Sequence, residues 1–161
     1  MDFKVDLDRC ENFGDVFEVV KKAVEKVLGR RRAGLMLVLA DLPMNVGAFH
    51  GVGSNAIVMN RRLLDAVVSN NESKREVNSF VFSILLHEYL HSLGYIEEQE
   101  VRPLVIHISR QVFGEDHPTT KISLEGPMSL LPRIGLHYVP DNEREVQIVD
   151  DFDRSSIGYI S

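Results

Sequence analysis

The sequence predicts an α+β fold in which a small sheet packs against a buried central helix and a further helix follows. Two observations favour this class. Apolar residues recur at helical spacing in residues 15–28 and 77–93. Short continuous apolar runs at residues 35–40 and 56–59 are flanked by proline, glycine or asparagine, which is typical of strands. We therefore expect helices packed on one small sheet.

The first elements are predicted in the order helix, strand, strand, helix. Residues 15–28 place valine and alanine three and four positions apart, as on one face of a helix. Residues 35–40 predict a buried strand. A glycine-rich link at residues 47–53 leads to a second strand at 56–59, and residues 61–68 predict a short helix.

A central helix is the strongest prediction. Ser73 followed by Glu76 is the capping-box pattern that marks a helix start. In residues 77–93 apolar side chains surround almost the whole helix, and Gly94 is placed to end it. We expect this helix to be buried, which makes it a costly place for polar side chains that lack partners.

After residue 94 the predicted elements are separated by loops. Residues 97–113 predict a further helix, which Pro103 would kink because proline lacks a backbone N–H. Residues 115–118 are typical of a loop, and residues 136–139 and 145–149 predict two strands.

The length of 161 residues suits one domain, residues 1–161. Within it we expect a core at about residues 15–113 and a C-terminal extension at about 114–161. The acidic stretch at residues 150–153 is expected to be loosely held.

Composition narrows the partners and the location. The net charge of -6 argues against nucleic acid or an anionic membrane as the partner. The single cysteine, Cys10, excludes an internal disulfide framework and is typical of a reducing compartment. No secretory signal and no span long enough for a bilayer are expected, so we predict a cytoplasmic protein.

The sequence His87-Glu88-Tyr89-Leu90-His91 indicates the chemistry. Histidines four residues apart lie one turn apart on one face of a helix, where both imidazoles can bind one zinc ion. Glu88 lies beside them, where it can take a proton from a water molecule that the metal activates. We interpret the stretch as a zinc site, because one ion would satisfy polar groups that are otherwise costly to bury.

The chain resembles the zincin metallopeptidases, specifically their small single-domain members, over roughly residues 15–113. The order of elements and the HExxH stretch carry the resemblance. It implies zinc as cofactor, His87 and His91 as ligands and Glu88 as general base. It also implies that residues 56–59 are an edge strand along which an extended peptide substrate pairs.

The resemblance leaves several candidates for the third ligand. In gluzincins a glutamate of the next helix completes the site, and Glu100 is the expected residue. Glu97 or Glu98 is the first alternative, since metzincins place their third ligand at the position of Glu97. A histidine, His107 or His117, is the second alternative.

The expected function is hydrolysis of a peptide or protein substrate by a zinc-activated water, with Glu88 as base. The alternative is a latent or inactive zincin-fold domain in which zinc is structural and the domain binds or regulates a partner. A third hypothesis is an interaction protein without metal. His50, Tyr95 and Tyr138 are further candidates for contacts to substrate or to a transition-state oxygen.

Overall fold

The computed structural model describes residues 2–51, 53–70, 73–126 and 143–154, and it confirms the α+β class. The described helices are α1 (Phe3–Asp8), α2 (Phe13–Leu28), α3 (Arg61–Ser69), α4 (Lys74–Ser92), α5 (Glu98–Phe113) and α6 (Pro118–Glu125). The described strands are β1 (Met36–Ala40), β2 (Ala48–His50), β3 (Ala56–Asn60) and β4 (Gln147–Ile148). None of the described helices combines the length and apolarity needed to cross a membrane.

The sheet has the strand order β2-β3-β1-β4. β3 pairs with β1 in parallel and with β2 in antiparallel orientation. The prediction that residues 56–59 form an edge strand is therefore wrong, because β3 has a neighbour on each side. The edge beside it belongs to β2, a three-residue strand inside the predicted glycine-rich link.

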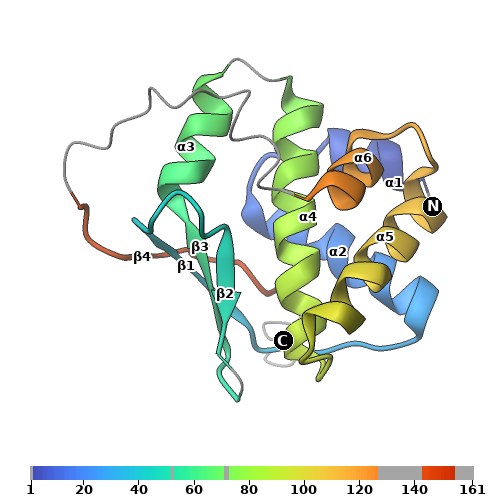
Figure 1. Ribbon diagram of the computed structural model, residues 1–161, viewed down its shortest axis with the longest axis horizontal. Helices are drawn as coiled ribbons and strands as arrows, with labels where there is room; N and C mark the ends of the chain where they lie inside the picture. The colour runs from blue at the N-terminus through green and yellow to red at the C-terminus, as the bar shows by residue number, and fades with distance from the viewer. Residues whose placement is uncertain (1, 52, 71–72, 127–142, 155–161) are drawn as a thin grey trace.

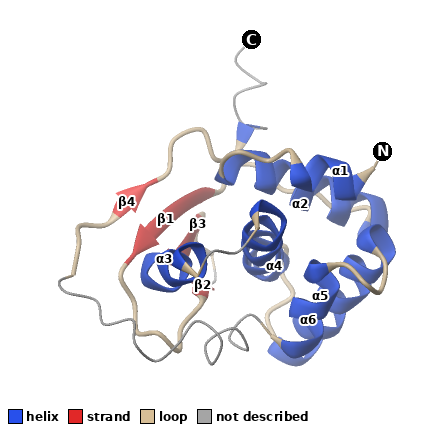
Figure 2. Cartoon of the chain, turned by 90° about the horizontal axis from the view of Figure 1, so that it is seen from above, coloured by secondary structure: helices blue, strands red, loops and turns tan. Residues whose placement is uncertain are grey.

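The central helix α4 lies between the sheet on one side and α1, α2, α5 and α6 on the other (Figures 1 and 2). Its start is as predicted, since the Ser73 side chain accepts a hydrogen bond from the Glu76 backbone N–H. Side chains on all sides of α4 are buried, including Phe80, Phe82 and Tyr89. The all-round apolar pattern is explained by this position, because every face of α4 meets another element.

The buried core extends beyond residues 15–113 at both ends. Phe3 and Leu7 of α1 are buried in it, as are Ile122 of α6 and Phe152. The sequence pattern did not reveal α1 or α6, because helices of six and eight residues are too short for a clear period. The loop predicted at residues 115–118 is in part the start of α6, with His117 as its N-cap and Pro118 in its first turn.

The second half of the acidic stretch at residues 150–153 is buried, contrary to the prediction of a loosely held segment, whereas Asp150 and Asp151 are exposed. Asp153 is buried, with its carboxylate 2.6 Å from Lys21 Nζ and 3.0 Å from the Leu35 backbone nitrogen. Phe152 stacks on Phe17 at 4.2 Å between ring centroids. Asp153 anchors this segment because its carboxylate is the counter-ion of the buried Lys21. No local sequence pattern indicates this contact.

The two strands predicted near the C-terminus have different outcomes. Residues 145–149 contain β4, which pairs with β1 in antiparallel orientation. The strand predicted at residues 136–139 lies outside the described residues.

Candidate metal centre

The end of α4 places His87 and His91 side by side, with their ring centroids 5.0 Å apart. Gly94 follows the helix with a φ of 107°, a value that favours glycine. Its backbone N–H donates to the His91 carbonyl, and the Tyr95 N–H donates to the Leu90 carbonyl. These two bonds form a Schellman motif, which reverses the chain and directs it back towards the histidines.

The reversal brings the first residue of α5, Glu98, onto the histidine pair. Its carboxylate oxygens lie 3.0 and 3.1 Å from His87 Nε2, and one of them lies 2.5 Å from His91 Nε2. The three potential ligand atoms all lie within 4.8 Å of one another. Two imidazole nitrogens and one carboxylate are the protein ligands of many catalytic zinc sites.

Glu100, the expected third ligand, is not part of this group, and exposure does not distinguish it from Glu98, because both side chains are exposed. Residues two apart on an α-helix point about 200° away from each other, so Glu98 and Glu100 cannot share a face. Glu97 is the N-cap of α5 and is also outside the group. The structure thus supports Glu98, one of the alternatives that the sequence left open.

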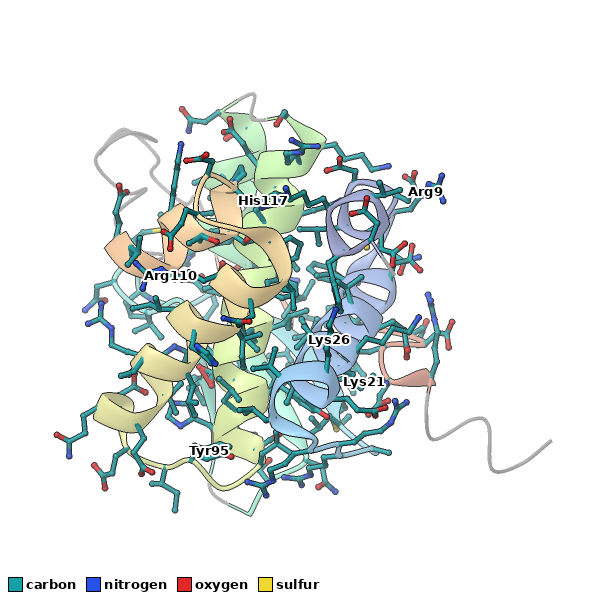
Figure 3. All side chains as sticks on the ribbon, turned by 90° about the vertical axis from the view of Figure 1, so that its right-hand side faces the viewer. Arg9, Lys21, Lys26, Tyr95, Arg110 and His117 are labelled. Carbon is teal, nitrogen blue, oxygen red and sulfur yellow. The ribbon has the colours of Figure 1, made fainter. Side chains whose placement is uncertain are left out.

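The two histidine alternatives lie elsewhere. His117 is buried against Phe113 and the N-terminal turn of α6. Figure 3 shows it at the opposite end of the helical layer from Tyr95, which follows the end of α4. His107 is exposed on α5, nine residues after Glu98 and therefore about 13 Å further along the helix axis.

The hydrogen bonds of His91 test whether a cation fits this group. Its Nδ1 lies 2.8 Å from the Tyr95 carbonyl oxygen, and its Nε2 faces the Glu98 carboxylate. Both partners are acceptors, whereas a neutral imidazole has a single N–H. With that proton on Nδ1, the Nε2 lone pair is free for a cation held jointly with Glu98, which is the arrangement common in histidine-ligated metal sites.

The pKa shifts of His87 and Glu98 favour the protonation states in which these side chains bind a metal ion. Burial lowers the pKa of His87, Glu98 opposes this effect, and the electrostatic influence of His91 and Arg102 adds to it. Burial raises the pKa of Glu98, but its hydrogen bonds and charge interactions with His87 and His91 outweigh burial and lower that pKa. A neutral imidazole and an ionised carboxylate are the states that bind a metal ion.

Glu88 is the buried acid of the site. Its side chain is only slightly exposed, and among the described residues its Oε2 has no hydrogen-bond partner. Burial is the main cause that raises the pKa of Glu88 to about 7. Together with His91 and Glu98, Glu88 lines a cavity of about 260 Å³. A carboxyl group with this pKa is suited to exchanging a proton with a water molecule near neutral pH.

The edge strand β2 forms the opposite wall of this cavity through Ala48, Phe49 and His50. His50 Nε2 lies 2.7 Å from the Ser54 carbonyl oxygen, so the ring donates there and its Nδ1 is left as an acceptor when neutral. His50 is thus present in the cavity, but in the neutral form it would accept rather than donate a hydrogen bond.

The tyrosine candidates do not gain support as donors. The Tyr95 backbone carbonyl oxygen is the hydrogen-bond partner of His91 Nδ1. The Tyr95 ring lies under the guanidinium group of Arg30, with 5.1 Å between them. Tyr138 lies outside the described residues.

The third ligand can be tested by comparing two glutamates of one helix. We expect Glu98→Gln to weaken zinc binding by more than the roughly 10- to 100-fold that loss of an outer partner causes, since a ligand itself is removed. Glu100→Gln is the matched control and should leave the affinity unchanged. Competition with a chromophoric chelator measures both, and the opposite ranking of the two variants would restore Glu100 as the ligand.

Comparison with protein-family models, curated proteins and solved structures found no match for this chain.

Proposed function

We propose that this chain is a zinc-dependent peptidase with a zincin-like fold, in which His87, His91 and Glu98 hold the metal. One observation carries the proposal: the three ligand atoms converge next to a buried glutamate that lines the same cavity. Histidines that served only packing would not require a carboxylate from a second helix. They would also not explain why a buried Glu88 oxygen beside them has no hydrogen-bond partner among the described residues. A cytoplasmic location belongs to the same proposal, on the strength of the single cysteine.

Each residue of the proposed site has a separate role in hydrolysis. A zinc ion in this site would lower the pKa of a water molecule and polarise the peptide carbonyl group. Glu88 accepts the proton of that water as the oxygen attacks the carbonyl carbon, and it then gives the proton to the leaving amine. Glu88 is buried and lines the same cavity as His91 and Glu98, a placement suited to both transfers. Tyr95 holds the ring of His91 in the required orientation through its carbonyl oxygen.

We place the substrate along β2 and not along β3. Among the described strands β2 pairs only with β3, so its other side is available for an extended peptide. All three residues of β2 line the cavity that contains Glu88 and His91. Phe49 of β2 and Ile96 near the start of α5 are large exposed apolar side chains at this cavity, and they would contact apolar substrate residues.

The proposal predicts zinc-dependent cleavage. The zinc-loaded protein should hydrolyse components of a mixed peptide library, a chelator should stop hydrolysis, and added zinc should restore it. Mass spectrometry of the products reports the cleaved bonds. A protein that binds one zinc ion but cleaves no peptide would instead support the alternative of a structural metal in a binding or regulatory domain. A protein that binds no zinc would contradict both.

A further inference from the structure

A second cavity, of about 350 Å³, opens on the other side of the histidine pair. His87 and Glu98 form part of its wall, so the cavity begins at the metal centre itself. Its remaining lining includes Ser83 of α4 together with Arg102 and Val105 of α5. Its size is in the range of pockets that hold small ligands or ligand groups.

Helix geometry explains why α5 presents these residues together. Glu98, Arg102 and Val105 are spaced by four and three residues, which places them on one face of the helix. A side chain bound beside the metal would therefore lie along Arg102, one turn beyond the metal ligand.

Two polar groups of the cavity lack partners within the described chain. Arg102 makes no ion pair or hydrogen bond with any described residue. The Ser83 hydroxyl is buried, with the residue 1% exposed, and it too has no described partner. Buried hydroxyl groups are normally hydrogen-bonded, so an unpaired one that lines a cavity indicates a position for a ligand acceptor or donor.

The charges at the cavity favour an anion. Glu98 faces the two histidines, where a divalent metal ion would more than neutralise it. Glu125 also lines the cavity, and its side chain, like that of Arg102, is exposed to solvent, where single charges are screened. Arg102 is the one arginine or lysine among the described residues of the lining, and a guanidinium group binds carboxylates in a bidentate manner.

We propose that this cavity binds a substrate carboxylate next to the bond to be cleaved, with Arg102 as the specificity-determining residue and Ser83 as a second hydrogen-bond donor. This inference rests on the proposed peptidase function for its substrate class. The carboxylate has two possible sources, an Asp or Glu side chain or the C-terminal carboxylate of a peptide. The first would give cleavage beside acidic residues, and the second would give removal of C-terminal residues.

Two pairs of acetylated, fluorescently labelled peptides distinguish these sources. The first pair has an amidated C-terminus and carries either Glu or Gln at one internal position. The second pair has only neutral side chains and ends in either a free carboxylate or an amide. Fluorescence anisotropy with the zinc-loaded protein measures binding, and product analysis of the same mixtures measures cleavage.

In one pair at least, we expect the carboxylate peptide to bind about tenfold more tightly than its neutral partner, as for a charged hydrogen bond. Arg102→Gln should remove this preference, and Arg102→Glu should reverse it towards a peptide with Lys at the same position. Arg110→Gln is the matched control, because Arg110 is an exposed arginine of the same helix that pairs with Glu115.

Equal binding within both pairs would overturn the inference, as would a carboxylate preference that persists in Arg102→Gln, since a carboxylate bound by the metal alone behaves in that way. The binding and cleavage measurements distinguish this inference from the proposed peptidase function. Cleavage without a carboxylate preference would contradict the inference and leave the peptidase function standing. An Arg102-dependent preference without cleavage would support the cavity and contradict the peptidase function.

Discussion

Glu88→Gln should lower kcat/KM for peptide hydrolysis by about 10²- to 10⁴-fold, the usual contribution of a general acid or base. The amide has nearly the same shape as the carboxyl group but cannot accept the proton of the attacking water. Zinc binding should be unchanged, because the proposed ligand atoms belong to His87, His91 and Glu98. Steady-state kinetics together with metal analysis of the same preparation measures both quantities.

The control for this substitution is Glu100→Gln, which makes the same chemical change on an exposed part of α5. It should retain full activity and full zinc content. A Glu88→Gln variant that keeps zinc and hydrolyses peptides at the original rate would exclude Glu88 as the base. A variant that loses zinc would indicate that Glu88 is itself a ligand.

Asp153→Ala should reduce the free energy of unfolding by about 3 kcal/mol, the lower end of the effect expected when one partner of a buried ion pair is removed. Lys21 has no exposed surface, and its Nζ lies 2.6 Å from Asp153 and 2.9 Å from the partly exposed Glu18. Figure 3 labels Lys21 on α2. The substitution leaves this buried ammonium group without its 2.6 Å contact to Asp153, and the Leu35 N–H also loses the Asp153 acceptor.

Urea unfolding followed by circular dichroism measures the loss. Asp150→Ala changes an exposed aspartate of the same stretch and should stay within about 0.5 kcal/mol of the original protein. The double variant Lys21→Met, Asp153→Leu should recover much of the stability, because replacing a buried ion pair by apolar groups is often neutral. Similar losses in Asp153→Ala and Asp150→Ala would contradict the buried pair as the anchor of this segment.

The long elements could be predicted because their signals are local and redundant. The helix α4 has a capping box, an apolar pattern over several turns and a terminating glycine, and all three agree. The strand β2 could not be predicted in this way. It has three residues, of which Phe49 is exposed, and it is a strand because it pairs with β3. Its pairing partner gave the clear strand signal and was therefore misassigned to the sheet edge.

The candidate site was predictable in its histidines and in Glu88, whose roles depend on spacing within one helix. The proposed third ligand, Glu98, depends on how α5 is rotated about its axis relative to α4, which is a tertiary property. The sequence did contain a signal for it. Glu98 is in phase with the buried residues Val101, Val105 and Ile108, at spacings of three, seven and ten, whereas Glu100 is out of phase with them.

The most direct test of the zinc centre is a crystal structure of the zinc-loaded protein with anomalous data collected on both sides of the zinc absorption edge. We predict one anomalous peak bonded to Nε2 of His87, Nε2 of His91 and the carboxylate of Glu98, at about 2.0–2.2 Å from each. Glu88 should lie beside the ion without ligating it. An ion that takes Glu100 in place of Glu98, or an absence of zinc between the two histidines, would contradict the account.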